Sequence, residues 1–106
     1  MGNVIRFDKD RTPEFNPTNN KAVRDRIKQL WDKGLTRFSY HARKRMYERS
    51  IDSTDIQHII RYGKIVDHSK PGDYWRFKIE GKTTDDVLLS CVIEIEDKLI
   101  IVTVMD

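Results

Sequence analysis

The spacing of apolar residues changes at Gly63, and this change limits the possible folds more than any other feature of the chain. Before Gly63, apolar residues such as Val23 and Ile27 recur at three- and four-residue intervals, which is typical of amphipathic helices. After Gly63 they alternate, as Phe77 and Ile79 do, which is typical of strands with one buried face. Helices followed by strands predict an α+β fold, with N-terminal helices packed on one face of a four-stranded antiparallel sheet.

The helical pattern covers residues 20–33, 39–49 and 53–62. Gly34 and Gly63 are suitable residues to end the first and third helices. The expected N-caps are Ser39 for the second helix, Ser53 for the third, and Thr18, Asn19 or Asn20 for the first.

The alternating pattern predicts strands over residues 64–68, 74–80, 87–96 and 99–105. Trp75, Phe77 and Ile79 are expected to face the helices. The connections are a turn at Pro71-Gly72-Asp73, a polar loop at 81–86 and a tight hairpin turn at Asp97-Lys98.

A chain of 106 residues has room for one domain of this kind. Pro13, Pro17 and the polar residues around them predict an irregular arm at 1–19, which leaves 20–106 as the single domain. The apolar runs are far too short to cross a membrane, so no membrane partner is expected. The N-terminus lacks the pattern of a signal peptide, and one cysteine, Cys91, cannot form an internal disulfide, so the expected location is the cytoplasm.

Positive charge is concentrated in the first half of the chain. Residues 1–50 hold 13 Lys and Arg against 6 Asp and Glu, whereas residues 51–106 hold 7 against 11. This asymmetry favours an acidic partner such as a phosphate backbone or an acidic protein. The alternative is a solvated basic helical surface that faces an acidic sheet edge in the same molecule.

The second predicted helix carries the residues best suited to phosphate chemistry. His41, Arg45 and Glu48 lie at positions i, i+4 and i+7, so they share one helix face, with Arg49 alongside. A histidine transfers protons near neutral pH, and arginines offset the charge that develops on a phosphate in the transition state. The alternative is an ordinary surface helix with a histidine in its first turn and an Arg/Glu pair.

A second candidate surface lies on the strand at 74–80. Tyr74, Arg76 and Lys78 point away from the expected core and combine an aromatic ring with cations, as RNA-binding surfaces do. An ordinary solvent-exposed strand face explains them equally well. Trp75, on the opposite side, is expected in the core.

The sequence gives little support for a metal or a cofactor. His41, His58 and His68 fall on separate elements without the spacing of metal ligands, so no metal site is predicted. Cys91 alternates with apolar neighbours and is expected to be buried. The chain has no phosphate-binding glycine loop and no dinucleotide fingerprint.

Several motifs, in order and at similar spacing, resemble a bacterial family of domains of unknown function, the DUF4258 proteins. The motifs are Phe38-Ser-x-His41-Ala42-x-x-Arg45-Met46-x-x-Arg49-x-Ile51, Asp55-Ile56, Gly63-Lys64-Ile65, Tyr74-x-Arg76-Phe77 and Ile101-Val102-Thr103-Val104. The resemblance covers residues 38–104, and Ser50 stands where the family is expected to favour glycine.

The family's helix–helix–sheet layout is similar to that of barnase-like and RelE-like ribonucleases and toxins, although a shared fold does not fix function. That resemblance implies a site made of His41, Arg45, Arg49, Arg76 and Thr103.

Three functions are compatible with these observations. The first is a metal-independent endoribonuclease, such as the toxin of a toxin–antitoxin pair, with His41 as general acid or base. Its catalytic set would be His41, Arg45, Arg76 and Thr103, and its RNA-binding set Arg43, Lys44, Arg49, Tyr74 and Lys78. The second is a non-catalytic module that binds RNA or an acidic protein. The third is a structural or regulatory protein that docks a partner, such as an antitoxin-like protein, through helix 20–33.

Overall fold

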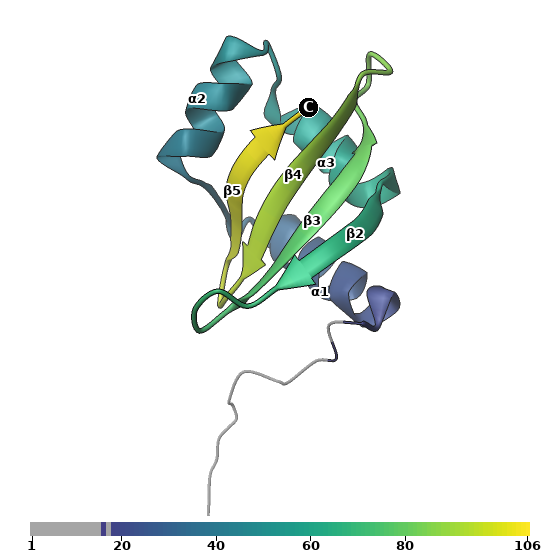
Figure 1. The fold of residues 1–106 in the computed structure, drawn as a ribbon, viewed down its shortest axis with the longest axis vertical. Helices are drawn as coiled ribbons and strands as arrows, with labels where there is room; N and C mark the ends of the chain where they lie inside the picture. The colour runs from purple at the N-terminus through teal and green to yellow at the C-terminus, as the bar shows by residue number, and fades with distance from the viewer. Residues whose placement is uncertain (1–15, 17) are drawn as a thin grey trace, which may run out of the picture.

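The computed structural model describes residue 16 and residues 18–106. Most of the arm predicted at residues 1–19 therefore lies outside the described residues. The helices are α1 (Asn20–Asp32), α2 (Tyr40–Glu48) and α3 (Ser53–Tyr62), and the strands are β1 (Thr36–Phe38), β2 (Lys64–Ser69), β3 (Trp75–Lys82), β4 (Leu88–Ile95) and β5 (Leu99–Met105) (Figure 1). The predicted α+β class is confirmed.

The sheet has five strands in the order β1-β5-β4-β3-β2, and β1 runs parallel to β5. The predicted four-stranded antiparallel sheet was therefore wrong in strand number and in being wholly antiparallel. The missing strand, β1, is too short to show an alternating pattern. It forms because its ends bond to β5: the Leu99 N–H donates to the Leu35 carbonyl at 2.8 Å, and the Ser39 N–H donates to the Ile101 carbonyl at 3.0 Å.

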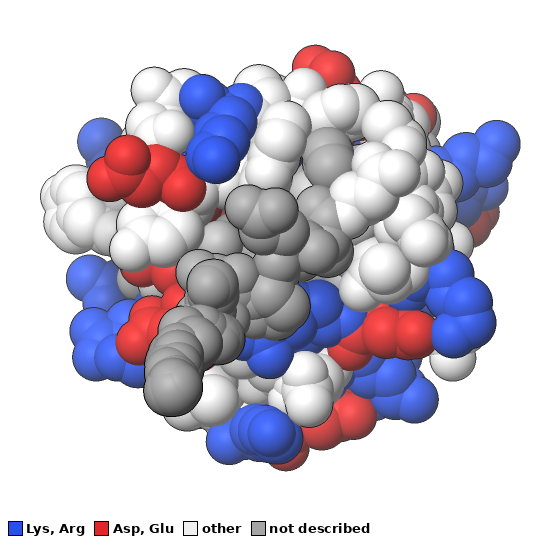
Figure 2. Space-filling view, turned by 90° about the horizontal axis from the view of Figure 1, so that it is seen from below, with Lys and Arg blue, Asp and Glu red and all other residues white. Residues whose placement is uncertain are grey.

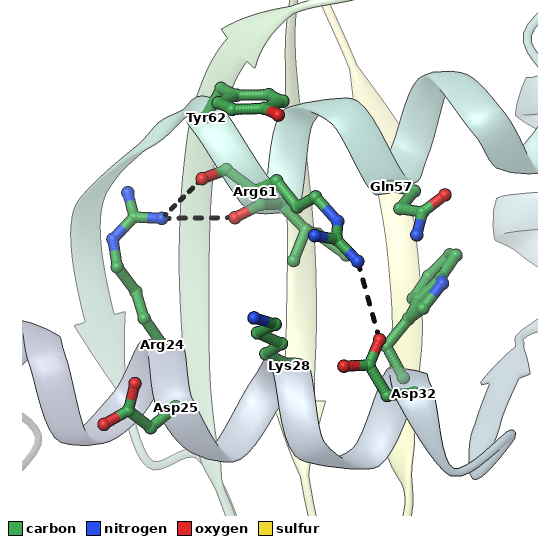
Figure 3. A pocket seen from close by; sticks show the side chains of 9 residues that line it. Arg24, Asp25, Lys28, Asp32, Gln57, Arg61 and Tyr62 are labelled. Carbon is green, nitrogen blue, oxygen red and sulfur yellow. Dashed lines mark hydrogen bonds and ion pairs between the residues drawn. The ribbon is translucent and has the colours of Figure 1, made fainter.

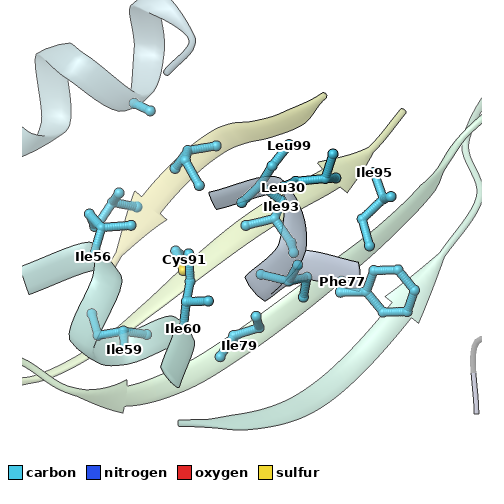
Figure 4. Packing of buried hydrophobic residues seen from close by; sticks show 14 of the residues in the cluster. Leu30, Ile56, Ile59, Ile60, Phe77, Ile79, Cys91, Ile93, Ile95 and Leu99 are labelled. Carbon is cyan, nitrogen blue, oxygen red and sulfur yellow. The ribbon is translucent and has the colours of Figure 1, made fainter. Parts of the chain in front are cut away.

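Helices α1 and α3 cover one face of the sheet, and α2 lies beside β5 (Figure 1). The core is formed between the covered face and these helices, where Ile79 lies near Ile59 and Ile60 of α3 and Phe77 belongs to the same buried cluster (Figure 4). Trp75 packs against the same cluster but stays half-buried. The prediction that these three residues of β3 face the helices is confirmed.

The N-caps of two helices agree with the sequence, and the third does not. Asn19 and Ser39 cap α1 and α2. The cap of α3 is Asp52, where Ser53 had been predicted. Asp52 accepts a hydrogen bond from the Asp55 N–H, and the Asp55 carboxylate accepts one from the Asp52 N–H. This reciprocal capping box satisfies two backbone donors, whereas a cap at Ser53 would satisfy one.

Strand β3 continues through Gly81 and Lys82, which had been predicted as loop. These residues pair with Leu89 and Leu88 of β4, and this cross-strand pairing outweighs their poor intrinsic strand preference. At Gly81 the strand passes directly against Gly63 at the end of α3. Two backbones can approach this closely only because neither residue has a side chain.

No helix among the described residues covers the other face of the sheet, which we call the open face (Figure 1). Residues paired across strands point to the same side, so the register defines which side chains share this face. One row across it contains Arg37, Ile100, Glu94, Arg76 and Ser69. The next row contains Thr103, Val92, Lys78 and Asp67.

Candidate nucleic-acid interface

Ser39 fixes the start of α2 beside the middle of β5. Its hydroxyl donates a hydrogen bond to the Val102 carbonyl at 2.6 Å and accepts one from the Ala42 N–H at 3.0 Å. At the other end of the helix, Arg49 forms an ion pair with Asp106, just after β5. Helix α2 is therefore held to β5 at both ends, and the residues along it have defined positions.

The buried side of α2 consists of Ala42 and Met46. His41 is exposed, and Arg45, one turn later, is half-buried. The Nε atom of Arg45 is buried and has no hydrogen-bond partner within the described part of the chain. The predicted sharing of one helix face by His41 and Arg45 agrees with the α2 helix, in which i and i+4 side chains are neighbours.

The outward side of α2 carries two tyrosines that had not been predicted as site residues. The exposed fraction is 74% for Tyr40 and 88% for Tyr47, which are large values for aromatic side chains. Arg43 and Lys44 lie between them and are also exposed. At about 100° per residue, these four positions fall on one stripe on the side of α2 away from the buried Ala42, which we call the tyrosine stripe. The three- and four-residue spacing of Tyr40, Arg43, Lys44 and Tyr47 was the available sequence signal.

On the open face, Arg76 does not stand alone. Its Nε donates to the Glu94 carboxylate at 2.6 Å, and the Glu94 side chain is only 16% exposed. Burial alone would raise the pKa of Glu94, but hydrogen bonds from Glu96 and Arg76 outweigh it and lower that pKa. The hydrogen bond to Glu94 raises the pKa of Glu96. The carboxylate of Glu94 therefore offsets much of the charge that Arg76 would offer to a phosphate.

Thr103 and Lys78 lie in one row of the open face, with Val92 between them. Arg76 lies in the neighbouring row. Strand β4 separates β5, which α2 contacts, from β3, which carries Arg76, so these two strands are about 10 Å apart. The predicted site residues therefore form two groups. Thr103, Lys78 and Arg76 lie together on the sheet, and His41 and Arg45 lie together on α2.

The remaining predicted residues have structural contacts or flank these groups. Tyr74, just before β3, is 42% exposed. His58 bonds through Nδ1 to the Lys82 carbonyl, and His68 lies against Trp75. Within residues 16 and 18–106, no group of three or more His, Cys, Asp or Glu side chains is arranged to hold a metal ion. Cys91 is buried, as predicted, and burial raises the pKa of its thiol to about 12.

A groove of about 220 Å³ separates α1 from α3 (Figure 3). Arg24 crosses it and donates to the Ile60 and Arg61 carbonyls at 3.2 and 3.3 Å. Arg61 reaches back to Asp32 at 3.5 Å. Arg24 and Arg61, two of the cations that line this groove, are therefore engaged in contacts within the fold. The end view in Figure 2 also shows Lys and Arg interspersed with Asp and Glu, so the described residues visible at that end do not form a surface of a single charge.

A family model described as a domain of unknown function, DUF4258, matches residues 38–106. The chain belongs to the DUF4258 family. The match agrees with the resemblance found over residues 38–104 and includes α2, α3 and strands β2 to β5. Helix α1 lies outside it. Neither a curated protein nor a solved structure matches this DUF4258 chain. Within the described residues, no helix is long and apolar enough to span a membrane.

Proposed function

We propose that this protein binds RNA through the exposed surface of α2. The observation that supports the proposal is that the cations on the exposed surface of α2 are unpaired within the described part of the chain. Arg43 and Lys44 are exposed and, among the described residues, have no acidic partner, whereas Arg76 on the open face is paired with Glu94. Unpaired exposed cations are available to phosphates at little cost, while Arg76 would first have to leave a carboxylate.

The experiment is a salt titration of RNA binding, followed by fluorescence anisotropy with a labelled single-stranded oligonucleotide. Each phosphate contact to a single strand contributes about 0.7 to the slope of log K against log salt concentration. Replacing both Arg43 and Lys44 with Ala should therefore weaken binding and reduce the slope by about 1.4.

The control is the double variant Lys33→Ala/Lys64→Ala, which removes the same charge from exposed positions outside α2. It should leave most of the affinity and the slope unchanged. Equal effects of the two double variants would mean that RNA senses only net charge. No binding at low salt would contradict the proposal.

Cleavage of the bound RNA is the second candidate function, and the position of His41 favours it. The imidazole is exposed and lies one turn before Arg45. In the proposed reaction the 2′-oxygen attacks the adjacent phosphorus while His41 takes the 2′-OH proton, and His41 then gives this proton to the 5′-oxygen as the P–O5′ bond breaks. Arg45 offsets the charge on the phosphorane. The products are a 2′,3′-cyclic phosphate and a 5′-OH. A toxin of a toxin–antitoxin pair would act in this way. Its antitoxin-like partner would then dock on helix 20–33 of this protein.

A His41→Ala variant tests the cleavage. Loss of a general acid or base typically slows a reaction by about 100- to 10,000-fold while leaving binding nearly intact. His68→Ala, which removes another exposed histidine, is the control and should cut at the normal rate. Assays with and without a chelator show whether the reaction is independent of metal. If His41→Ala cuts RNA as fast as the wild type, His41 is not catalytic.

A further inference from the structure

We propose that Tyr40 and Tyr47 form a clamp that holds two successive bases of an unpaired RNA segment between their rings. This inference rests on the proposed RNA binding and assigns its substrate class. The two rings are the most exposed large apolar side chains among the described residues. Exposed aromatic rings beside cations are the elements from which single-strand binding surfaces are built.

The helix sets the distance between the rings. Tyr40 and Tyr47 are seven residues apart within α2, and a rise of about 1.5 Å per residue separates their positions by about 10.5 Å. Seven residues also correspond to nearly two full turns, so both rings project from the same side. Both rings can therefore contact one strand that runs along the helix.

This distance matches a short stretch of stacked strand. Successive bases in one strand are about 3.4 Å apart, so 10.5 Å spans about three steps. The three steps are ring to base, base to base and base to ring, so two successive bases fit between the tyrosines with one phosphate joining them. Arg43 and Lys44 lie between the rings on the same stripe, where this phosphate would pass.

The clamp requires single-stranded RNA. A tyrosine can stack only on a base with a free face, and inside a duplex both faces are already covered by neighbouring bases. Such stacking tolerates any sequence, because every base has a flat face. An acidic protein segment would also meet the cations. Binding of such a segment would not require two aromatic rings about 10.5 Å apart, whereas base stacking does, and for this reason we favour RNA.

The test measures affinity for oligoribonucleotides of one to eight nucleotides by anisotropy at low salt. Affinity should rise most steeply from one to two nucleotides and more slowly beyond, and a blunt duplex should bind much more weakly. Tyr40→Ala and Tyr47→Ala should each weaken binding of the tetranucleotide by about 5- to 150-fold. The corresponding Phe variants should keep most of the affinity because the ring remains.

Tyr62→Ala is the matched control. Tyr62 is 73% exposed but lies on α3, where its ring packs on His58 at 4.8 Å between centroids. Its removal should not change RNA affinity, and circular dichroism should show that all variants keep their helices. Tight binding of long RNA with no dependence on either α2 tyrosine, or equal binding of duplex, would overturn the clamp and leave the RNA proposal standing. Binding of an acidic peptide but of no RNA at any length would overturn both.

Discussion

Replacing Gly63 with alanine should destabilise the fold, although its backbone conformation accepts any residue. Gly63 ends α3 with φ −80° and ψ −179°, an extended conformation. Conformational entropy alone would therefore favour alanine by about 0.4–1 kcal/mol. The surroundings oppose it. A Cβ atom at Gly63 would lie 2.5 Å from the carbonyl oxygens of both Glu80 and Ile59, and these backbone atoms cannot move aside independently.

The magnitude follows from these two opposing effects. Overpacking of a well-packed site typically costs about 1–3 kcal/mol, and part of this is offset by the entropic gain. The expected net loss is about 1–2 kcal/mol of the free energy of unfolding. For a domain of this size, that corresponds to a melting temperature lower by roughly 5–15 °C.

Thermal unfolding and urea titration of Gly63→Ala and Gly72→Ala measure the effect. Gly72 is the matched control, because a Cβ atom there would meet nothing within 4 Å. Gly72→Ala should be neutral or slightly stabilising. Gly81→Ala should behave like Gly63→Ala, because its Cβ would lie 2.9 Å from the Gly63 Cα. If Gly63→Ala were as stable as Gly72→Ala, the close crossing of α3 and β3 would be wrong.

Three further predictions concern buried or half-buried polar groups. Ser39→Ala removes the cap of α2 and the bond to Val102, and should cost about 1–2 kcal/mol in urea unfolding; a cost near zero would mean that the cap is not important. Burial would raise the pKa of Asp55, but hydrogen bonds from Thr84 and Asp52 outweigh it and lower the pKa. The resulting stability is present above the unfolded pKa of about 3.9 and is lost as the pH falls. The difference in free energy of unfolding between wild type and Asp55→Asn should therefore shrink between pH 5 and pH 2. A constant difference would contradict this assignment. Because burial raises the pKa of Cys91 to about 12, a thiol reagent at pH 8 should modify it far faster in urea than in the folded protein, and equal rates would place the thiol at the surface.

The sequence alone predicted the features that depend on neighbouring residues in the chain. The three helices, the cap at Ser39 and the end of α1 at Gly34 follow from local hydrogen bonding and from the positive φ of 75° that glycine accepts. The buried faces were also predictable, since Phe77 and Cys91 belong to regular apolar patterns. The motif from Phe38 to Ile51 pointed to the DUF4258 family, which the family match confirms.

Contacts between distant segments could not be read in this way. Strand β1 exists because Leu35 and Ser39 bond to β5, more than 60 residues later in the chain. The pairing of Arg76 with Glu94 depends on the register of β3 and β4, and it changes the electrostatics expected of Arg76. Likewise, the spacing of Ala42 and Met46 indicates the buried side of α2, but only the tertiary packing shows that this side lies against β5 and that the tyrosine stripe stays exposed. Local patterns are set by hydrogen bonds and sterics within a few residues, whereas a partner across the sheet is selected by the packing of the whole core.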